Sequence, residues 1–173
     1  MSVFESPATK WLEERNVPFK RVYVKPGTVV DHETLAEYFS KEIGIPTSML
    51  MKTIILDNPR DKTQHPVALI MPGDAMIDID AFAQALGVRK MRLCRKERAH
   101  AYTGYEFGGT SPFGLAREAD VKVYMEKSAV EMANHGPIWI NGGGVGDIVE
   151  MNVDDLLKAL NPTLVSVTSK QQN

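Results

Sequence analysis

The sequence predicts an α+β fold, in which a single mixed, strongly curved β-sheet or barrel has helices packed outside it. The chain has 173 residues, which is the usual length of one domain. Short apolar, β-branched runs are interleaved with segments of helical periodicity, but too irregularly for a doubly wound parallel sheet. Neither a repeat nor a linker divides the chain. We therefore expect one domain over residues 1–168 and a frayed tail over residues 169–173.

Helix-capping residues mark the expected helices. The pair Ser6-Pro7 combines a capping hydroxyl with a residue suited to the first helical position, and the helix that it starts should end near Asn16. A short helix is expected over residues 95–102. Three further helices should be capped by Asp31, Asp78 and Asn152, and the first two of these should end at Gly44 and Gly87.

The expected strands are short. Apolar or alternating runs predict about eight of them, separated by turn-forming residues. They cover residues 19–24, 52–56, 67–71, 88–93, 121–125, 138–140, 148–151 and 164–167.

Composition restricts the class of function. The 20 Lys and Arg residues against 22 Asp and Glu give a formal net charge of −2, so any contact with nucleic acid has to be local. The single cysteine, Cys94, excludes an internal disulfide and favours a reduced, cytoplasmic setting. No apolar run reaches the length of a membrane span, and the N-terminus lacks the regions of a signal peptide. Because the four histidines lie more than thirty residues apart, we expect neither a metal nor a cofactor.

The glycine-rich segment over residues 104–114 is the most informative motif. Ser111 does not fit the G-x-S-x-G pattern of serine hydrolases, and Pro112 lacks the N–H group that such a site needs after its serine. The segment instead offers main-chain N–H groups that can hold a carbonyl oxygen or an anion. These are the N–H groups of Gly108, Gly109, Thr110 and Ser111. The alternative is a surface loop rich in turn residues.

A second glycine run, Gly142 to Gly144, follows an expected strand. It matches neither a P-loop nor a dinucleotide-binding fingerprint, because no Gly-Lys-Ser/Thr ending and no helix follow it. The absence of side chains lets a ligand or another stretch of backbone come close. The run therefore forms either a wall of a ligand site or a tight turn.

Lys52 and a cluster of basic residues between positions 89 and 98 each have two possible interpretations. Lys52 opens an apolar strand, so its side chain either reaches the rim of the sheet or points into a cavity. Six basic residues lie within ten positions, which suits a phosphate backbone as well as a solvated strand edge. They are Arg89, Lys90, Arg92, Arg95, Lys96 and Arg98.

The motif Thr103-Gly104-Tyr105-x-x-Gly108-Gly109-x-Ser111-Pro112-x-Gly114 resembles the signature of the YbaK/ProX-like aminoacyl-tRNA deacylases. That family is related to the editing domain of bacterial prolyl-tRNA synthetases. The Met51-Lys52-Thr53 strand start and the glycine run at Gly142 come in the family's order, so that the resemblance covers essentially the whole chain.

The resemblance implies an enzyme that acts in trans on mischarged tRNA, hydrolysing Cys- or Ala-tRNA for proline. In this comparison Lys52 contacts the terminal nucleotide, and the loop from Gly108 to Pro112 holds the aminoacyl carbonyl. Tyr23 and the run Gly142 to Gly144 are further substrate-binding candidates. Many members carry an acidic residue two positions after a glycine of the second loop. Counted from Gly146, that position holds Ile148 in this chain, and Asp147 lies one position earlier.

The resemblance also implies aminoacyl-tRNA as the partner. The weakly basic face of the chain suggests that a prolyl-tRNA synthetase delivers this tRNA, although recruitment of the partner stays open. The basic residues Arg89, Lys90, Arg92 and Arg95 are the candidates for contact with tRNA. An alternative from another class of protein uses the same basic segment, residues 89–98: a non-catalytic module that binds tRNA or a synthetase. Multiple-turnover hydrolysis of mischarged tRNA would support the enzyme and exclude the non-catalytic module.

Overall fold

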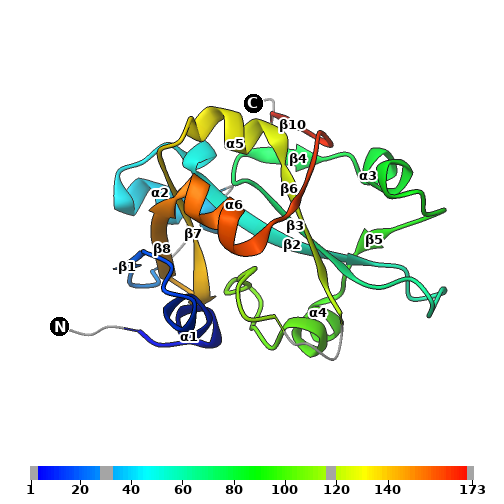
Figure 1. Ribbon diagram of the computed structural model, residues 1–173, viewed down its shortest axis with the longest axis horizontal. Coiled ribbons are helices and arrows are strands. Elements are labelled where there is room, and N and C mark those ends of the chain that lie inside the picture. The colour runs from blue at the N-terminus through cyan, green and yellow to red at the C-terminus, as the bar shows by residue number, and fades with distance from the viewer. Residues whose placement is uncertain (1–3, 28–32, 116–119, 171–173) are drawn as a thin grey trace.

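The computed structural model describes residues 4–27, 33–115 and 120–170 (Figure 1). The helices in these ranges are α1 (Pro7–Glu14), α2 (Leu35–Ile43), the 3-10 turn η1 (Thr47–Met49), α3 (Ile79–Leu86), α4 (Lys96–Thr103), α5 (Lys127–Ala133) and α6 (Val153–Leu160). The strands are β1 (Lys20–Tyr23), β2 (Leu50–Asp57), β3 (Val67–Pro72), β4 (Ala75–Ile77), β5 (Arg92–Leu93), β6 (Lys122–Glu126), β7 (Pro137–Gly144), β8 (Asp147–Asn152), β9 (Thr163–Val165) and β10 (Thr168–Lys170).

The main sheet is mixed. Its strands follow the order β1-β8-β7-β2-β3-β6-β9, and β5 pairs with β2 outside this path. The pairs β7–β2, β3–β6 and β6–β9 are parallel, and the remaining pairs are antiparallel. The predicted α+β class with a mixed sheet is therefore confirmed, whereas the strong curvature stays a prediction.

Strand β2 shares one of its edges between two neighbours. Leu50 and Met51 pair with β7, and Leu56 and Asp57 pair with β5. Because β3 occupies the opposite edge, β7 and β5 diverge from the same side of β2. Among the described strands, none pairs with residues 52–54 on this side. The sheet thus has a gap beside the middle of β2.

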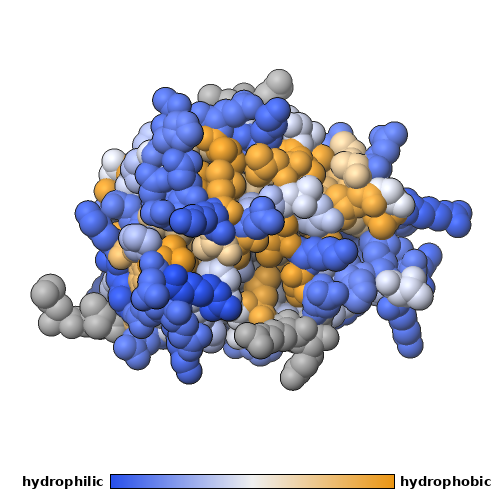
Figure 2. Space-filling model, in the orientation of Figure 1, coloured by the Kyte–Doolittle hydropathy of each residue, from blue (hydrophilic) through white to orange (hydrophobic). Residues whose placement is uncertain are grey.

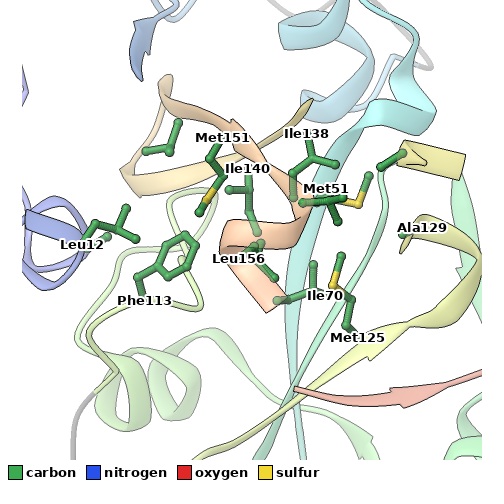
Figure 3. Packing of buried hydrophobic residues seen from close by; sticks show 14 of the residues in the cluster. Leu12, Met51, Ile70, Phe113, Met125, Ala129, Ile138, Ile140, Met151 and Leu156 are labelled. Atoms are coloured by element: carbon green, nitrogen blue, oxygen red, sulfur yellow. The ribbon is translucent and has the colours of Figure 1, made fainter. Parts of the chain in front are cut away.

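Helices cover both faces of the sheet. Side chains from α1, α5 and α6 form one cluster with strand residues such as Met51 and Ile140, and Figure 3 shows these side chains pointing toward one another. Leu50 precedes Met51 but packs in a different cluster, beside α2. Leu56 packs under α3 in a third cluster. Since alternate residues of a strand point to the same face, α2 and α3 lie on the face opposite to α1, α5 and α6.

Most helix signals read from the sequence are correct. Ser6, Asp78 and Asn152 cap α1, α3 and α6 through side-chain oxygens. The second helix differs, because Thr34 caps α2 and forms a capping box with Glu37. The expected cap Asp31 lies outside the described residues.

Several elements differ from the sequence prediction. The expected strand over residues 88–93 shrinks to Arg92–Leu93, because only these two residues pair with β2. Helix α5 was not predicted; the Glu126 side chain caps it by accepting a hydrogen bond from the Ser128 N–H. The tail was expected to fray from residue 169, but Thr168–Lys170 pair with β4 as strand β10. Residues 171–173 lie outside the described part of the chain.

The described helices are all short. The longest of them, α2, has nine residues, and none of them has the length and apolar character needed to cross a membrane. On the face shown in Figure 2, hydrophilic residues surround several areas of hydrophobic ones. The main apolar clusters lie between the sheet and these short helices.

Candidate active site

A cavity of about 520 Å³ lies where β7 and β5 diverge from β2. Its floor is formed by residues 50–55 of β2, and its walls come from α2, the glycine-rich loop and the segment from β5 into α4. The wall residues are Thr34, Leu35, Ala36, Phe39, Gly73, Leu93, Cys94, Lys96, Ala99, Phe107, Gly108, Thr110, Asn141 and Ile148. Most of these side chains are apolar, and the volume is typical of a small-molecule site.

Lys52 lines this cavity. Its Nζ donates a hydrogen bond to the carbonyl of Ala75 at 3.0 Å and lies 3.5 Å from the carbonyl of Gly73. Burial lowers the pKa of Lys52, while the nearby Asp74 carboxylate acts in the opposite direction. A side chain at position 73 would collide with the backbone, since a Cβ there would lie 2.6 Å from the Leu50 carbonyl oxygen. Because it has no side chain, Gly73 lets its main chain lie against the start of β2, next to Lys52. Sequence reasoning missed this residue.

Thr53 presents polar atoms that sequence reasoning also missed. Its Oγ1 is buried and has no hydrogen-bond partner among the described residues. On the β5 side of β2, the Ile55 carbonyl accepts a hydrogen bond from the Cys94 N–H at 2.9 Å. Because alternate residues direct their main-chain groups to the same edge, the N–H and C=O of Thr53 point into the gap beside β2. Thr53 thus brings its main-chain N–H and C=O to the floor of the cavity, whereas its Oγ1 is buried inside the protein.

The glycine-rich loop divides into lining and supporting residues. Gly108 has a φ of 85° and lines the cavity together with Thr110. The N–H of Gly109 donates to the Glu106 carbonyl at 2.9 Å, so the expectation that it is free is wrong. Ser111 is fully buried, and its Oγ accepts a hydrogen bond from the N–H of Phe113. The loop therefore contributes Phe107, Gly108 and Thr110 to the lining of the cavity, and it uses buried residues such as Ser111 to hold its shape.

Asn141 connects the two glycine segments, and nothing in its sequence pattern signalled this role. Its Nδ2 donates to the Gly144 carbonyl at 2.8 Å and to the Gly108 carbonyl at 3.3 Å. Its Oδ1 accepts from the N–H of Gly143 at 2.6 Å. The segments also touch directly, since a Cβ on Gly109 would come within 2.9 Å of the Gly144 backbone. Asn141 fixes the loop against the end of β7.

The run Gly142 to Gly144 directly follows Asn141 in β7, and its glycines are not among the described lining residues of the cavity. A Cβ on Gly142 would lie 2.8 Å from Val149, and one on Gly143 would lie 2.8 Å from Ser6. These glycines therefore allow close packing of the chain. Pro112 is buried and is likewise not among the described lining residues.

Two other candidate residues, Tyr23 and Asp147, are not among the described lining residues of the cavity. Tyr23 is more than half exposed and lines a second, shallower hollow of about 450 Å³ together with Tyr38 and Glu42. The structure does not bring Tyr23 together with Lys52. Asp147 follows the hairpin turn after Gly144, and burial raises the pKa of its carboxyl group.

The basic segment has two parts. Arg89, Lys90, Arg92 and Arg95 are exposed, as expected of a surface that contacts phosphates. Arg98 instead binds the buried carboxylate of Asp57, with its Nε and one terminal nitrogen at 2.6 and 3.2 Å from the two carboxylate oxygens. Arg98 therefore belongs to the packing of α4 and not to the basic surface.

The cavity offers a cation and main-chain groups rather than a strong nucleophile. Among its described lining residues there is no histidine and no carboxylate. Burial, with a contribution from Asp57, raises the pKa of the Cys94 thiol to about 11, so that this sulfur is almost entirely protonated at neutral pH. Within the described ranges, no three His, Cys, Asp or Glu side chains are placed to hold a metal ion. Such a site can orient a reactive substrate and stabilise negative charge.

Known proteins with similar sequences or folds agree with this architecture. A protein of Enterococcus faecalis named "Putative Cys-tRNA(Pro)/Cys-tRNA(Cys) deacylase EbsC" is 27% identical over 164 residues, which cover 95% of this chain and 93% of that protein. The solved structure of the hypothetical protein APE2540 has a TM-score of 0.77 at 21% identity, covering 95% of this chain and all of that one. A structure described as "a putative trans-editing enzyme for prolyl tRNA synthetase" has a TM-score of 0.76 at 16% identity, covering 96% and 99%.

The family model described as the aminoacyl-tRNA editing domain matches residues 29–159. This range holds Lys52, the glycine-rich loop and Asn141, and so most of the cavity wall. The chain belongs to the aminoacyl-tRNA editing domain family.

Proposed function

We propose that this protein hydrolyses the ester bond between tRNA and a wrongly attached amino acid, and that Cys- and Ala-tRNA for proline are its substrates. The observation that carries the proposal is that Lys52 and the glycine-rich loop line one cavity. The family and the relative named as a Cys-tRNA(Pro) deacylase support this substrate class. A prolyl-tRNA synthetase is the expected source of the mischarged tRNA.

In the proposed reaction the cavity orients an ester that is already activated. A water oxygen attacks the aminoacyl carbonyl carbon, and the ester bond to the ribose oxygen then breaks. The neighbouring ribose hydroxyl positions the water and helps to remove its proton, and the leaving ribose oxygen takes up a proton. The protein therefore supplies orientation and charge stabilisation rather than a nucleophile of its own.

The residues of the cavity have distinct roles in this proposal. Main-chain N–H groups at Gly108 and Thr110 stabilise the developing oxyanion. The Lys52 ammonium is fixed by the Ala75 carbonyl and contacts the terminal nucleotide. Asn141 keeps the loop in place through the Gly108 carbonyl. The apolar side chains of the lining accommodate a small side chain such as that of cysteine or alanine.

The test is a deacylation panel across mischarged tRNAs, comparing the wild type with Lys52→Ala. We expect Lys52→Ala to lower kcat/KM on Cys- or Ala-tRNA for proline by at least about 100-fold, in line with loss of a charge-stabilising group. Lys127→Ala removes an exposed lysine on α5, on the opposite face of the sheet, and is the matched control. Unchanged turnover by a folded Lys52→Ala variant would refute the role given to Lys52.

The exposed basic residues favour a second candidate, the non-catalytic module that binds tRNA or a synthetase. It predicts salt-sensitive binding of tRNA without turnover, and loss of binding when Arg92 and Arg95 are neutralised. The same panel decides between the two proposals, because multiple-turnover hydrolysis by the wild type excludes the module.

A further inference from the structure

Phe107 and Lys96 form an exposed pair at the mouth of the cavity. Phe107 is 65% exposed, and the Lys96 Nζ lies 4.2 Å from the centre of its ring. Both side chains line the cavity, one from the glycine-rich loop and the other from the first turn of α4. The floor beneath them is buried, since Leu50 and Met51 are only 4% and 2% exposed. The pair therefore lies where a long substrate leaves the cavity.

Packing does not explain the position of Phe107. The same loop contains Tyr105 and Phe113, which are 3% and 0% exposed and belong to the main core cluster. Phe107 is turned outward instead, and the Lys96 ammonium lies over one face of its ring. An exposed aromatic ring beside a cation is the combination with which proteins bind single-stranded nucleic acid, because bases stack on the ring and the cation meets the phosphate.

Positive charge continues outward from this pair. Arg95 directly precedes Lys96, Arg92 lies three residues further back, and both side chains are exposed. Arg98 does not take part, because it binds Asp57. In a chain whose formal net charge is −2, this concentration of cations beside an open cavity is complementary to a phosphate backbone.

We propose that Phe107 and Lys96 bind the single-stranded nucleotides that precede the terminal adenosine of the tRNA. A cytosine base stacks on the Phe107 ring, and the Lys96 ammonium contacts a neighbouring phosphate. The inference rests on the proposed function, because it assumes that the esterified adenosine occupies the cavity. It adds a binding subsite outside the cavity that contributes to the affinity for tRNA and not to the chemical step.

The experiment compares a long and a short substrate. Alanyl- or cysteinyl-tRNA for proline carries the preceding nucleotides, whereas the same amino acid esterified to adenosine lacks them. We expect Phe107→Ala to raise KM on the tRNA about tenfold and to lower, by the same factor, the ratio of kcat/KM on tRNA to kcat/KM on the adenosine ester. Phe107→Trp should retain the wild-type ratio, because indole also stacks. Met132→Ala, which removes a 44% exposed apolar side chain from α5, is the control.

Lys96→Ala tests the phosphate contact through salt. Removing one contact to a single strand should make the slope of log(kcat/KM) against log[salt] shallower by about 0.7 for the tRNA, without changing it for the adenosine ester. Equal losses on both substrates, or an unchanged ratio in Phe107→Ala, would overturn the inference and leave the proposed function standing. A wild-type protein that hydrolyses neither substrate would instead contradict the proposed function, and the inference would fall with it.

Discussion

At the scale of single residues, Thr53 combines features that folding alone does not favour. Its hydroxyl is buried without a partner among the described residues, and a buried polar group in this state costs about 1–3 kcal/mol. Its main-chain groups point into the gap between β7 and β5. Proteins retain such locally unfavourable groups mainly at functional sites. The main-chain groups of Thr53 are therefore the ones available to a bound substrate, whereas its hydroxyl is buried away from the cavity.

Replacing Thr53 by the isosteric valine separates these contributions. We expect Thr53→Val to raise the free energy of unfolding by about 1 kcal/mol, because the buried unpaired hydroxyl is removed, and to leave kcat/KM close to the wild-type value, because the main-chain groups that face the gap are unchanged. Urea unfolding and deacylation kinetics measure the two effects. Thr103→Val is the matched control, because the buried Thr103 hydroxyl donates to the Ala99 carbonyl and accepts from the Tyr105 N–H. That variant should be less stable, and a loss of stability in Thr53→Val as well would contradict this account.

The sequence predicted only part of this site. Residues within one contiguous motif could be identified, whereas residues whose role depends on contacts between distant segments could not. Lys52 and the glycine-rich loop lie in contiguous motifs, so their candidacy could be read directly. The role of Thr53 depends on strand register, and that of Asn141 on contact with Gly108, which is 33 residues away. Gly109 shows the opposite error, a residue that the motif suggested wrongly. The motif does not reveal that the Gly109 N–H already donates a hydrogen bond to the Glu106 carbonyl.

At the scale of elements, helix α4 is attached through polar contacts. Arg98 and Tyr102 on this helix both contact the buried Asp57 at the end of β2, and the Tyr102 hydroxyl donates at 3.2 Å. The helix carries Lys96 and Ala99 to the cavity wall. The basic segment was predicted as one patch, since a sequence pattern does not distinguish an arginine that faces a buried carboxylate from one that faces solvent.

Breaking this attachment should affect both stability and activity. We expect Arg98→Met to lower the melting temperature by several degrees, because it leaves the Asp57 carboxylate buried without its partner. It should also lower kcat/KM by displacing the wall that α4 forms. Arg95→Met, which removes an exposed charge from the N-cap of the same helix, is the control for stability and should melt like the wild type.

The double variant Asp57→Asn/Arg98→Met provides a further check, because it removes the unpaired charge as well. It should recover part of the loss in melting temperature, as expected of two residues that interact directly. Additive losses in the double variant would show that the ion pair does not hold α4.

At the scale of the whole molecule, the C-terminal segment supports the cavity from a distance. Strand β10 pairs with β4, and the carbonyl of Ala75 in β4 accepts the hydrogen bond of Lys52. The buried Glu126 side chain holds the start of this segment, since one of its oxygens accepts from the N–H groups of Val167 and Thr168 at 2.7 and 2.8 Å. Sequence reasoning expected a frayed tail here because the pairing of β10 with β4 joins segments about ninety positions apart.

A truncation tests this long-range support. A chain that ends at Val167 lacks β10, so β4 loses its partner strand and the Ala75 carbonyl is held less firmly. We expect a lower melting temperature and a kcat/KM reduced about tenfold, since small displacements of a positioned group have effects of this size or larger. The control ends at Lys170 and keeps β10, and it should match the full chain in both measurements. If the shorter chain melted later than the control, or if both hydrolysed mischarged tRNA at the wild-type rate, β10 would have no part in positioning Lys52.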